Sequence, residues 1–404
     1  MNQRGPSDPV SDAHGKTLRV LVVDDSAYNR QTLTSMLEAD PQIEVVGRAI
    51  NGRDALQSVM EVAPDVITLD LEMPEMDGFA FLRLLMARRP TPVIVISSHS
   101  ARDTVFRALE LGAMDFMAKP SRQIGPELRE IQGELLRKIR LVKRLHAVRL
   151  QHRAQALALQ RDARVTREMT ALPDPEDAST QGDARPVVIA HAPTAPAPAA
   201  TSGEPLGIVG IAASTGGPPA VQQLLCGLPG DLPIAVLVAQ HMPARFTRAF
   251  ASRLDKMCSL RVNEAIDGAP LQRGHVYISP GASNIEIAAG DDGVQLVVRT
   301  PEGAAQGKIT PSADLMLRAA AAQYGRRFCA VVLTGMGSDG REGAVFAREQ
   351  GSLVVVEDPQ TAVMPGMPQS VIDAGAADEV HALDDIPEVL IRFAERCKGG
   401  RGGA

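Results

Sequence analysis

The stretch GIVGIAASTGGPPA, residues 207–220, runs from small apolar residues into two glycines and two prolines. The apolar part is typical of a buried strand, and the proline pair suits the first turn of a helix, where a missing N–H costs nothing. The stretch therefore predicts a strand-to-helix turn with Ser214 at its corner. A hydroxyl there could cap the helix, bind a phosphate or act as a nucleophile. Residues elsewhere in the chain are needed to distinguish these three roles.

The same alternation of short apolar runs and helical stretches extends in both directions from this turn. It covers residues 18 to about 122 and resumes over residues 206 to about 396, and it is typical of βαβ units and a parallel sheet. A chain of 404 residues, 45% of them hydrophobic, is long enough for two or three domains. We therefore predict an α/β protein with a doubly wound parallel-sheet domain over residues 18–135 and an α/β parallel-sheet domain over residues 206–396.

Three segments lie outside these two predicted domains. Residues 1–17 are expected to be a disordered N-terminal extension, and residues 397–404 a flexible tail. Residues 136–205 are expected to begin as a basic helix and to continue as a flexible linker. The later part of this segment is rich in Pro, Ala, Ser and Asp, and it is too poor in large apolar side chains to fold alone.

The composition argues against several classes of protein. The net charge of −6 argues against a nucleic-acid partner, and the basic stretch at residues 137–167 is better explained as a solvated helix face than as the DNA-binding module of a transcription factor. The four cysteines form no CxxC pair, which suits a reducing cytosol better than a disulfide scaffold or a zinc site. The sequence has no bilayer-length apolar run and no apolar secretory segment at its start, so we expect a cytoplasmic protein that does not insert into a membrane.

Charged and polar side chains end successive apolar runs of the first domain. Asp24 and Asp25 follow LRVLVV, Asp70 follows VITL, and later runs end at Ser97 and Lys119. An open parallel sheet binds its ligands at the carboxyl ends of the strands, so these side chains are expected to converge. Three carboxylates repel one another unless a hard cation such as Mg²⁺ neutralises them, and a hydroxyl and an ammonium could hold phosphoryl oxygens. The alternative is a solvated acidic rim with an ordinary surface lysine.

This constellation resembles the receiver domain of response regulators over residues 18–122. The resemblance implies that Asp70 accepts a phosphoryl group and that a histidine kinase is the phosphodonor. It also implies that Mg²⁺ is held by Asp24, Asp25 and Asp70, with help from the backbone carbonyl of Glu72. The cation would then be a cofactor for phosphorylation of the receiver.

The same resemblance assigns a phosphorylation switch to three further residues. Ser97 would be the switch hydroxyl, Lys119 the phosphate-binding lysine and Phe116 the switch aromatic. Phe116 is explained equally well as core packing, because a phenylalanine lacks the phenolic hydroxyl that could form a hydrogen bond.

Two further strand ends of the second domain bear on the role of Ser214. His241 follows PIAVLVAQ, and Asp339 lies in the glycine-rich turn after FCAVVL. An acyl-transfer triad needs a base that takes the serine proton and a carboxylate that holds this base in one tautomer. The glycines of STGG and TGMGSDG would let backbone N–H groups approach a developing oxyanion. Taken singly, a helix-capping serine and a structural histidine are the alternatives.

A dinucleotide site is the competing interpretation of the glycine-rich turn. TGMGSDG matches the pattern G-x-G-x-x-G at Gly335, Gly337 and Gly340, and Glu357 ends the next apolar run, where a ribose-binding acid is expected. This interpretation leaves the serine and the histidine without a role and puts an aspartate charge beside a pyrophosphate. A receiver-linked dinucleotide-binding output domain is therefore the alternative and not the leading prediction.

Five motifs, in order, resemble the catalytic domain of the chemotaxis protein-glutamate methylesterase family: GIAASTGGP, AQHMPARFTRAFASRL, GHVYISPG, PSADLML and VVLTGMGSDGREGA. The resemblance implies that Ser214 is the nucleophile, His241 the general base and Asp339 the orienting acid. It places Thr215 and Met336 beside the site, the methionine contributing through its backbone N–H.

The reaction implied by this resemblance is hydrolysis of glutamyl methyl esters on methyl-accepting chemoreceptors, without a cofactor. Some members of the family also deamidate receptor glutamines, which is again acyl transfer to water. The receiver would restrain the catalytic domain until Asp70 is phosphorylated.

Overall fold

The computed structural model describes residues 17–97, 102–120, 126–141, 203–290, 293–301 and 309–399. Nearly all of the predicted N-terminal extension and most of the predicted linker lie outside these residues. The domain boundary predicted at residue 135 falls inside helix α5 (Pro126–Leu141). The tail begins later than predicted, because helix α12 (Ile386–Gly399) continues past residue 397 and Cys397 packs into the hydrophobic core.

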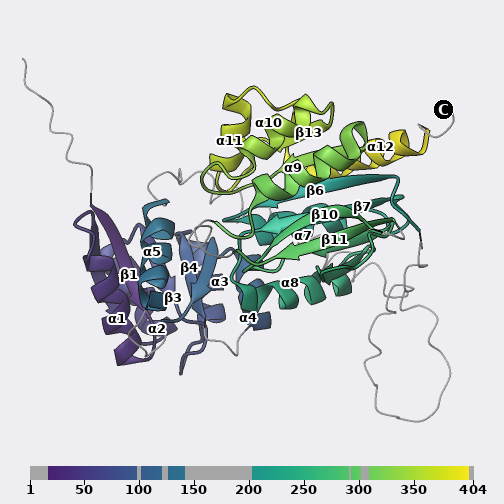
Figure 1. Ribbon diagram of the computed structural model, residues 1–404. Helices are drawn as coiled ribbons and strands as arrows, with labels where there is room; N and C mark the ends of the chain where they lie inside the picture. Colours follow the sequence, from purple (N-terminus) through teal and green to yellow (C-terminus); the bar gives the residue numbers. More distant parts are fainter. Residues whose placement is uncertain are drawn as a thin grey trace, which may run out of the picture.

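The N-terminal domain is a five-stranded parallel sheet in the order β2-β1-β3-β4-β5. Its elements before α5 are β1 (Leu18–Val23), α1 (Ala27–Glu38), β2 (Ile43–Ala49), α2 (Gly52–Val62), β3 (Val66–Leu69), α3 (Gly78–Arg88), β4 (Val93–Ser97), α4 (Arg102–Glu110) and β5 (Asp115–Ala118). Helices α1 and α5 pack on one face, and α2, α3 and α4 pack on the other (Figure 1). The doubly wound prediction is therefore confirmed.

The C-terminal domain is a seven-stranded sheet in the order β14-β13-β12-β6-β7-β9-β8, with every neighbouring pair parallel. Its main elements before α12 are β6 (Gly207–Ala213), α7 (Gly217–Cys226), β7 (Ile234–Gln240), α8 (Ala244–Met257), β8 (Arg261–Glu264), β9 (His275–Ile278), α9 (Ala313–Tyr324), β12 (Phe328–Val332), α10 (Arg341–Glu349), β13 (Leu353–Glu357), α11 (Gly366–Asp373) and β14 (Glu379–His381). The α/β prediction is confirmed. An antiparallel hairpin, β10 (Asn284–Gly290) with β11 (Gly293–Arg299), is an addition that the sequence patterns did not predict.

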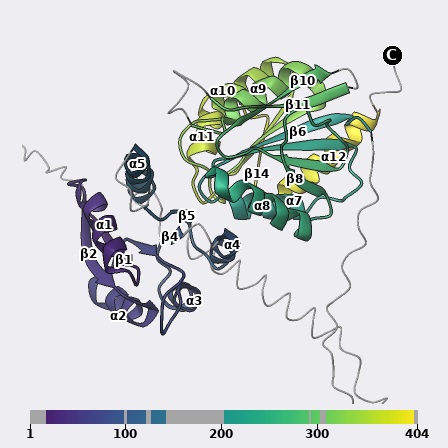
Figure 2. The ribbon, with the colours of Figure 1, turned by 60° about the horizontal axis from the view of Figure 1, so that its bottom comes forward.

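Two layers of helices cover this sheet because side chains of a strand alternate between its faces. Ile208 and Ala212 of β6 pack toward α9, α10, α11 and the hairpin, whereas Val209 and Ile211 pack toward α7, α8 and α12 (Figure 2). Among the helices that the structure describes, none is long and apolar enough to cross a membrane.

The two domains are in contact through α4 of the first and α7 and α8 of the second (Figure 1), and through β5, whose Phe116 packs on α8. The ring of Phe106 stacks on Phe250 with centroids 5.3 Å apart, and Phe116 meets Phe246 edge-on at 4.7 Å. These side chains belong to one continuous buried cluster that includes residues of both sheets. The contact therefore resembles a shared core more than a polar docking surface.

Packing explains why β6 has a residue without a side chain at Gly210. A Cβ added there would lie 2.8 Å from Cζ of Phe328 and 2.9 Å from Cδ2 of Leu317. Gly210→Val should therefore lower the free energy of unfolding of the C-terminal domain by about 1–3 kcal/mol, because a packed core resists added volume. Urea denaturation of the full chain, with the C-terminal transition followed separately, measures this loss.

Gly133→Ala is the control for this substitution. No heavy atom lies within 4 Å of the corresponding Cβ position in α5. Alanine is favoured over glycine inside a helix by roughly 0.5–1 kcal/mol, so this variant should be at least as stable as the parent protein. An unchanged midpoint for Gly210→Val would contradict the steric explanation.

Candidate active site

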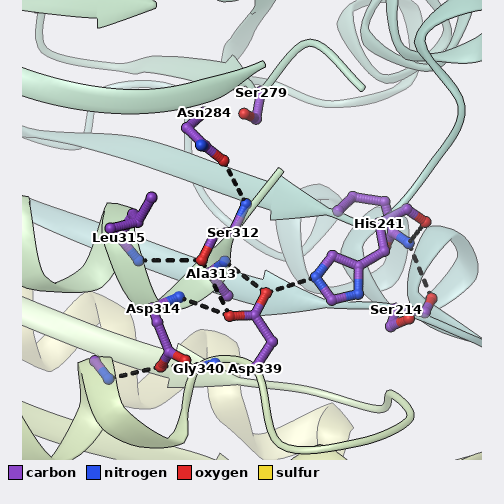
Figure 3. Close-up of polar contacts among 12 residues, drawn as sticks. Ser214, His241, Ser279, Asn284, Ser312, Ala313, Asp314, Leu315, Asp339 and Gly340 are labelled. Carbon is purple, nitrogen blue, oxygen red and sulfur yellow. Dashed lines mark hydrogen bonds and ion pairs between the residues drawn. The ribbon is translucent and has the colours of Figure 1, made fainter. Parts of the chain in front are cut away.

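Ser214, His241 and Asp339 meet at one edge of the C-terminal sheet (Figure 3). The serine directly follows β6, the histidine directly follows β7, and the aspartate lies between β12 and α10. Backbone pairing continues past the strand ends, because Ser214 N donates to Thr334 O at 3.0 Å and His241 N donates to Ala213 O at 3.0 Å. The neighbouring positions of the three strands therefore bring the three predicted side chains together.

The imidazole of His241 lies between the Asp339 carboxylate and Ser214 (Figure 3). Its Nε2 is 2.7 Å from Oδ2 of Asp339. A carboxylate accepts hydrogen bonds, so Nε2 is the donor in this contact, and Nδ1 is the ring nitrogen left to act as a base. Within the described residues no hydrogen bond joins the serine hydroxyl to this ring. Such bonds are often loose before substrate binds, and the ring is poised to act as a base through Nδ1.

The start of α9 holds Asp339 in place. Its Oδ2 accepts from Ala313 N at 2.8 Å, and its Oδ1 accepts from Asp314 N at 3.0 Å and from the Ser312 hydroxyl at 3.2 Å. Burial alone would raise the pKa of this carboxyl. The bond to His241 and the N–H groups of α9 outweigh burial and lower the pKa of Asp339 below its usual value. The group is therefore ionised and faces the base.

Three polar residues that the sequence analysis did not single out position this aspartate. Asn284 Oδ1 accepts from Ser312 N at 2.7 Å, and Ser312 also caps α9. Asp314 Oδ1 accepts from Gly340 N at 2.9 Å and from Gly343 N at 2.7 Å, which holds the loop that carries Asp339. Burial, with a smaller contribution from the nearby Asp339 charge, raises the pKa of Asp314 to about 6. The motif PSADLML was a clue to this helix start, but only the fold shows what it touches.

Gln240 connects the loops that carry the serine and the histidine. The side chain is 1% exposed, and its Nε2 donates to the carbonyl oxygens of Ser214, at 2.9 Å, and His241, at 3.0 Å. A Cβ on Gly217 would lie only 2.1 Å from Gln240 Oε1, so the start of α7 needs a glycine here. Nothing in the local sequence marks Gln240 as more than the end of an apolar run.

Two predicted neighbours of the site take different positions. The Thr215 hydroxyl donates to Oδ2 of Asp115 at 2.8 Å, so this side chain faces the N-terminal domain. Met336 is half-buried in the loop after β12. That loop lies against the serine, because a Cβ on Gly335 would be 2.9 Å from Cβ of Ser214.

Glu357, the acid of the dinucleotide interpretation, is turned into the protein. It is 1% exposed, and its Oε2 accepts from Thr334 N at 2.7 Å. A carboxylate that holds the backbone inside the core is not available to a ribose. The geometry therefore disfavours the dinucleotide alternative.

The predicted carboxylate cluster is also formed at the edge of the N-terminal sheet. Carboxylate oxygens of Asp24, Asp25 and Asp70 all lie within 4.8 Å of one another. Lys119 Nζ is 2.5 Å from Oδ2 of Asp70 and 3.4 Å from Oδ2 of Asp24. Three carboxylates in this arrangement are hard oxygen donors of the kind that Mg²⁺ prefers, so the residues fit that cation.

The charged groups of this cluster shift the pKa values of Asp70 and Lys119. Burial, reinforced by the charge of Asp24 and opposed by Lys119, raises the pKa of Asp70 to about 6. Burial alone would lower the pKa of Lys119, but its contacts with Asp70 and Asp24 raise this pKa above its usual value. An incoming cation or phosphoryl group would compete with the lysine for the same oxygens.

The other predicted residues of the N-terminal site take different positions. The N–H of Glu72 donates to Oδ1 of Asp70 at 3.2 Å. Ser97 is buried at the end of β4, and its carbonyl accepts from Lys119 N at 2.8 Å. Phe116 is buried in the contact between the domains, where it packs on Phe246.

The fold and the two sites define a class of protein: a receiver-type carboxylate site joined to a hydrolase-type Ser-His-Asp site. The family model described as CheB methylesterase matches residues 209–390, and that of the response regulator receiver domain matches residues 20–128. The chain belongs to the protein-glutamate methylesterase family and has a response regulator receiver domain.

Several curated relatives cover nearly the whole chain. A protein-glutamate methylesterase/protein-glutamine glutaminase of Anaeromyxobacter dehalogenans is 43% identical over 94% of this chain and 96% of its own length. Relatives with the same type of name are 40% identical in Geobacter sulfurreducens, over 95% of this chain and 98% of the relative, and 42% identical in Myxococcus xanthus, over 94% and 98%. The similarity therefore includes both domains.

The loop that carries Asp339 gives a test of positioning. Asp314→Ala removes the acceptor of two backbone N–H groups and should lower kcat for ester hydrolysis roughly tenfold, since a lost bond of this kind costs about 1–3 kcal/mol. Asp314→Asn keeps an acceptor oxygen and should stay within about threefold of the parent enzyme. Steady-state methanol release at matched folded fractions measures both. A large loss in the asparagine variant would mean that the charge, and not the loop, matters.

Proposed function

We propose that this protein hydrolyses glutamyl methyl esters on methyl-accepting chemoreceptors. The observation that carries the proposal is the junction of Ser214, His241 and Asp339 at adjacent strand ends, with 2.7 Å between the histidine and the aspartate. The names of the relatives support the choice of a glutamyl ester as substrate.

The proposed reaction uses the same three side chains in both halves. His241 Nδ1 takes the proton of Ser214 Oγ while this oxygen attacks the ester carbonyl. The tetrahedral intermediate collapses, methanol leaves with the proton returned by the imidazolium, and a glutamyl ester of the serine remains. Water, deprotonated by the same nitrogen, then attacks the acyl carbon. The second tetrahedral intermediate collapses, Ser214 Oγ leaves with the proton returned by the imidazolium, and the glutamate side chain is released. Asp339 stabilises the imidazolium in both halves.

We assign the oxyanion donor to the backbone N–H of Met336. The support is the position of its loop, since Gly335 lies directly beside Ser214. No cofactor is needed for these steps, because proton transfer and donor groups come from the chain. Deamidation of a receptor glutamine would follow the same path, with ammonia as the leaving group in place of methanol.

Methanol release from methylated receptor membranes tests the nucleophile. Ser214→Ala should reduce the rate by at least about a thousandfold, as should His241→Ala, and Asp339→Ala should be severe but less so. Ser279→Ala is the matched control: this serine also follows a parallel strand, but its hydroxyl donates to Ser283 O at 3.2 Å. Near-normal turnover of a folded Ser214→Ala protein would remove the serine from the mechanism.

We further propose that Asp70 accepts a phosphoryl group from the phosphohistidine of a chemotaxis histidine kinase. Asp24, Asp25 and Asp70, with the carbonyl of Glu72, would hold Mg²⁺, which supplies charge neutralisation to the incoming phosphoryl group. Lys119 and Ser97 would take the phosphoryl oxygens. We place this reaction in the cytoplasm, because none of the four cysteines is in a disulfide, which suits a reducing compartment.

We propose that the unphosphorylated receiver restrains the esterase. Strand β5 supports this, because it contacts both sites: Asp115 accepts from Thr215 beside the nucleophile, and Lys119 just beyond the strand pairs with Asp70. Around this strand, Glu110 of α4 forms an ion pair with Arg253 of α8 and accepts from Gln222 of α7 at 3.2 Å. A tenfold activation requires about 1.4 kcal/mol of differential stabilisation, which a phosphoryl charge near Lys119 could supply.

A charge swap at the domain contact tests the restraint. Glu110→Arg places two cations in contact, which should destabilise the arrangement in which the receiver contacts α7 and α8 by roughly 1 kcal/mol. Methanol release without phosphodonor should therefore rise about threefold to tenfold. The double variant Glu110→Arg/Arg253→Glu restores an opposite pair and should return to the basal rate.

Asp70→Asn separates release from phosphorylation. A small phosphodonor should not raise methanol release by the Asp70→Asn protein. The double variant Asp70→Asn/Glu110→Arg should keep the raised rate of methanol release without phosphodonor. A basal rate unchanged by Glu110→Arg, or lowered by it, would show that the contact does not restrain the enzyme.

A further inference from the structure

Two cysteines meet at the ends of the helices that follow the catalytic strands. Cys226 is the last residue of α7, and Cys258 directly follows α8. Their sulfur atoms are 2.8 Å apart, although the residues are separated by 32 positions in the sequence. A disulfide bond is about 2.05 Å long, so the two sulfurs need to approach by less than about 1 Å to form one.

We propose that Cys226 and Cys258 are a site of reversible oxidation, at which a peroxide converts two thiols to an intramolecular disulfide. No role in ester hydrolysis or phosphorylation uses these residues, so the inference does not depend on the proposed function. Neither residue is in a disulfide in this structure, and Cys226 is exposed.

A metal site is a poorer explanation of the pair. Two thiolates alone leave a soft cation such as Zn²⁺ short of the four ligands that it takes. Among the residues that the structure describes, the one group of three or more possible ligands that lie close together is Asp24, Asp25 and Asp70. Each thiol therefore has a second thiol with which it could form a disulfide, but the pair is not part of a group of metal ligands among the described residues.

The order of the two steps follows from exposure. The Cys226 sulfur attacks the peroxide, the O–O bond breaks, and water and a sulfenic acid result. The pKa of Cys258 is raised by the hydrogen bond of this thiol to Cys226 and, to a smaller extent, by burial. Cys258 is therefore the poorer first nucleophile. Cys258 then attacks the oxidised sulfur, the S–O bond breaks, and the departing hydroxide takes the Cys258 proton. In sum, two thiols lose two electrons and two protons, and the peroxide becomes two waters.

The cross-link would close a loop that contains β7 and His241. It joins α7 to α8, and these helices carry Gln222, Arg253 and Phe250 of the domain contact. Because the sulfurs already lie close together, the bond should form without displacing these helices. The expected consequence is a more stable C-terminal domain whose unfolded chain has lost conformational freedom.

Peroxide treatment of the full chain, followed by intact mass measurement and non-reducing peptide mapping, tests the proposal. The expected product is a monomer lighter by two hydrogen atoms, with the Cys226 and Cys258 peptides linked. Cys329 and Cys397, which are 0% and 8% exposed, should be recovered as thiols. The oxidised protein should melt about 5 °C or more above the reduced protein, and a thiol reductant should reverse the shift.

Serine variants distinguish this site from general oxidation. Cys226→Ser and Cys258→Ser should each abolish both the mass change and the melting shift, whereas the matched control Cys329→Ser should keep both. The comparison of oxidised with reduced parent protein remains decisive if a variant fails to fold. A disulfide between two chains, a bond that includes Cys397, or sulfinic acid at Cys226 without a linked Cys258 would overturn the proposal.

Discussion

Parallel pairing of β6 with both β7 and β12 is the constraint on which the catalytic arrangement depends. Parallel strands end at a common edge, so the turns that follow them meet there whatever their separation in the chain. Ser214 and His241 are placed by the strand ends that they follow, and Asp339 by the loop between β12 and α10. Gln240 then fastens the first two turns to each other through their carbonyl oxygens.

Both sites bury carboxylates, and each is stabilised in a different way. An isolated buried charge is costly unless it is paired or hydrogen-bonded. Asp339 receives N–H groups from the start of α9 together with an imidazole, and its pKa falls. Asp70 shares one ammonium with Asp24 and is buried, and its pKa rises. The first is held as a permanent anion, whereas the second is a group whose charge balance changes readily with a cation or a phosphoryl group.

The contact between the domains joins these two environments through a short piece of chain. Asp115 and Phe116 of β5 contact the catalytic domain, and Lys119, just after the strand, contacts the receiver carboxylates. A displacement of this strand would change its contacts with the catalytic domain and the contacts of Lys119 with the receiver carboxylates. The apolar rings give the contact its stability, and the polar pairs around them give it a defined register, because charges and hydrogen bonds are directional and burial of apolar surface is not.

The sequence by itself determined the two α/β domains and most of the side chains that carry chemistry, because strand ends and glycine-rich turns are local features. The periodic apolar runs predicted both parallel sheets, and residues at their ends, such as Asp70 and Ser214, were identified individually. Only the tertiary structure decided which distant residues serve them. Gln240, Asp314 and the Cys226–Cys258 pair lack a local pattern, since the groups that each contacts are brought close only by packing. Thr215 was predicted beside the nucleophile, but its hydroxyl faces Asp115, 100 positions away in the chain, because a second domain lies where solvent would otherwise be.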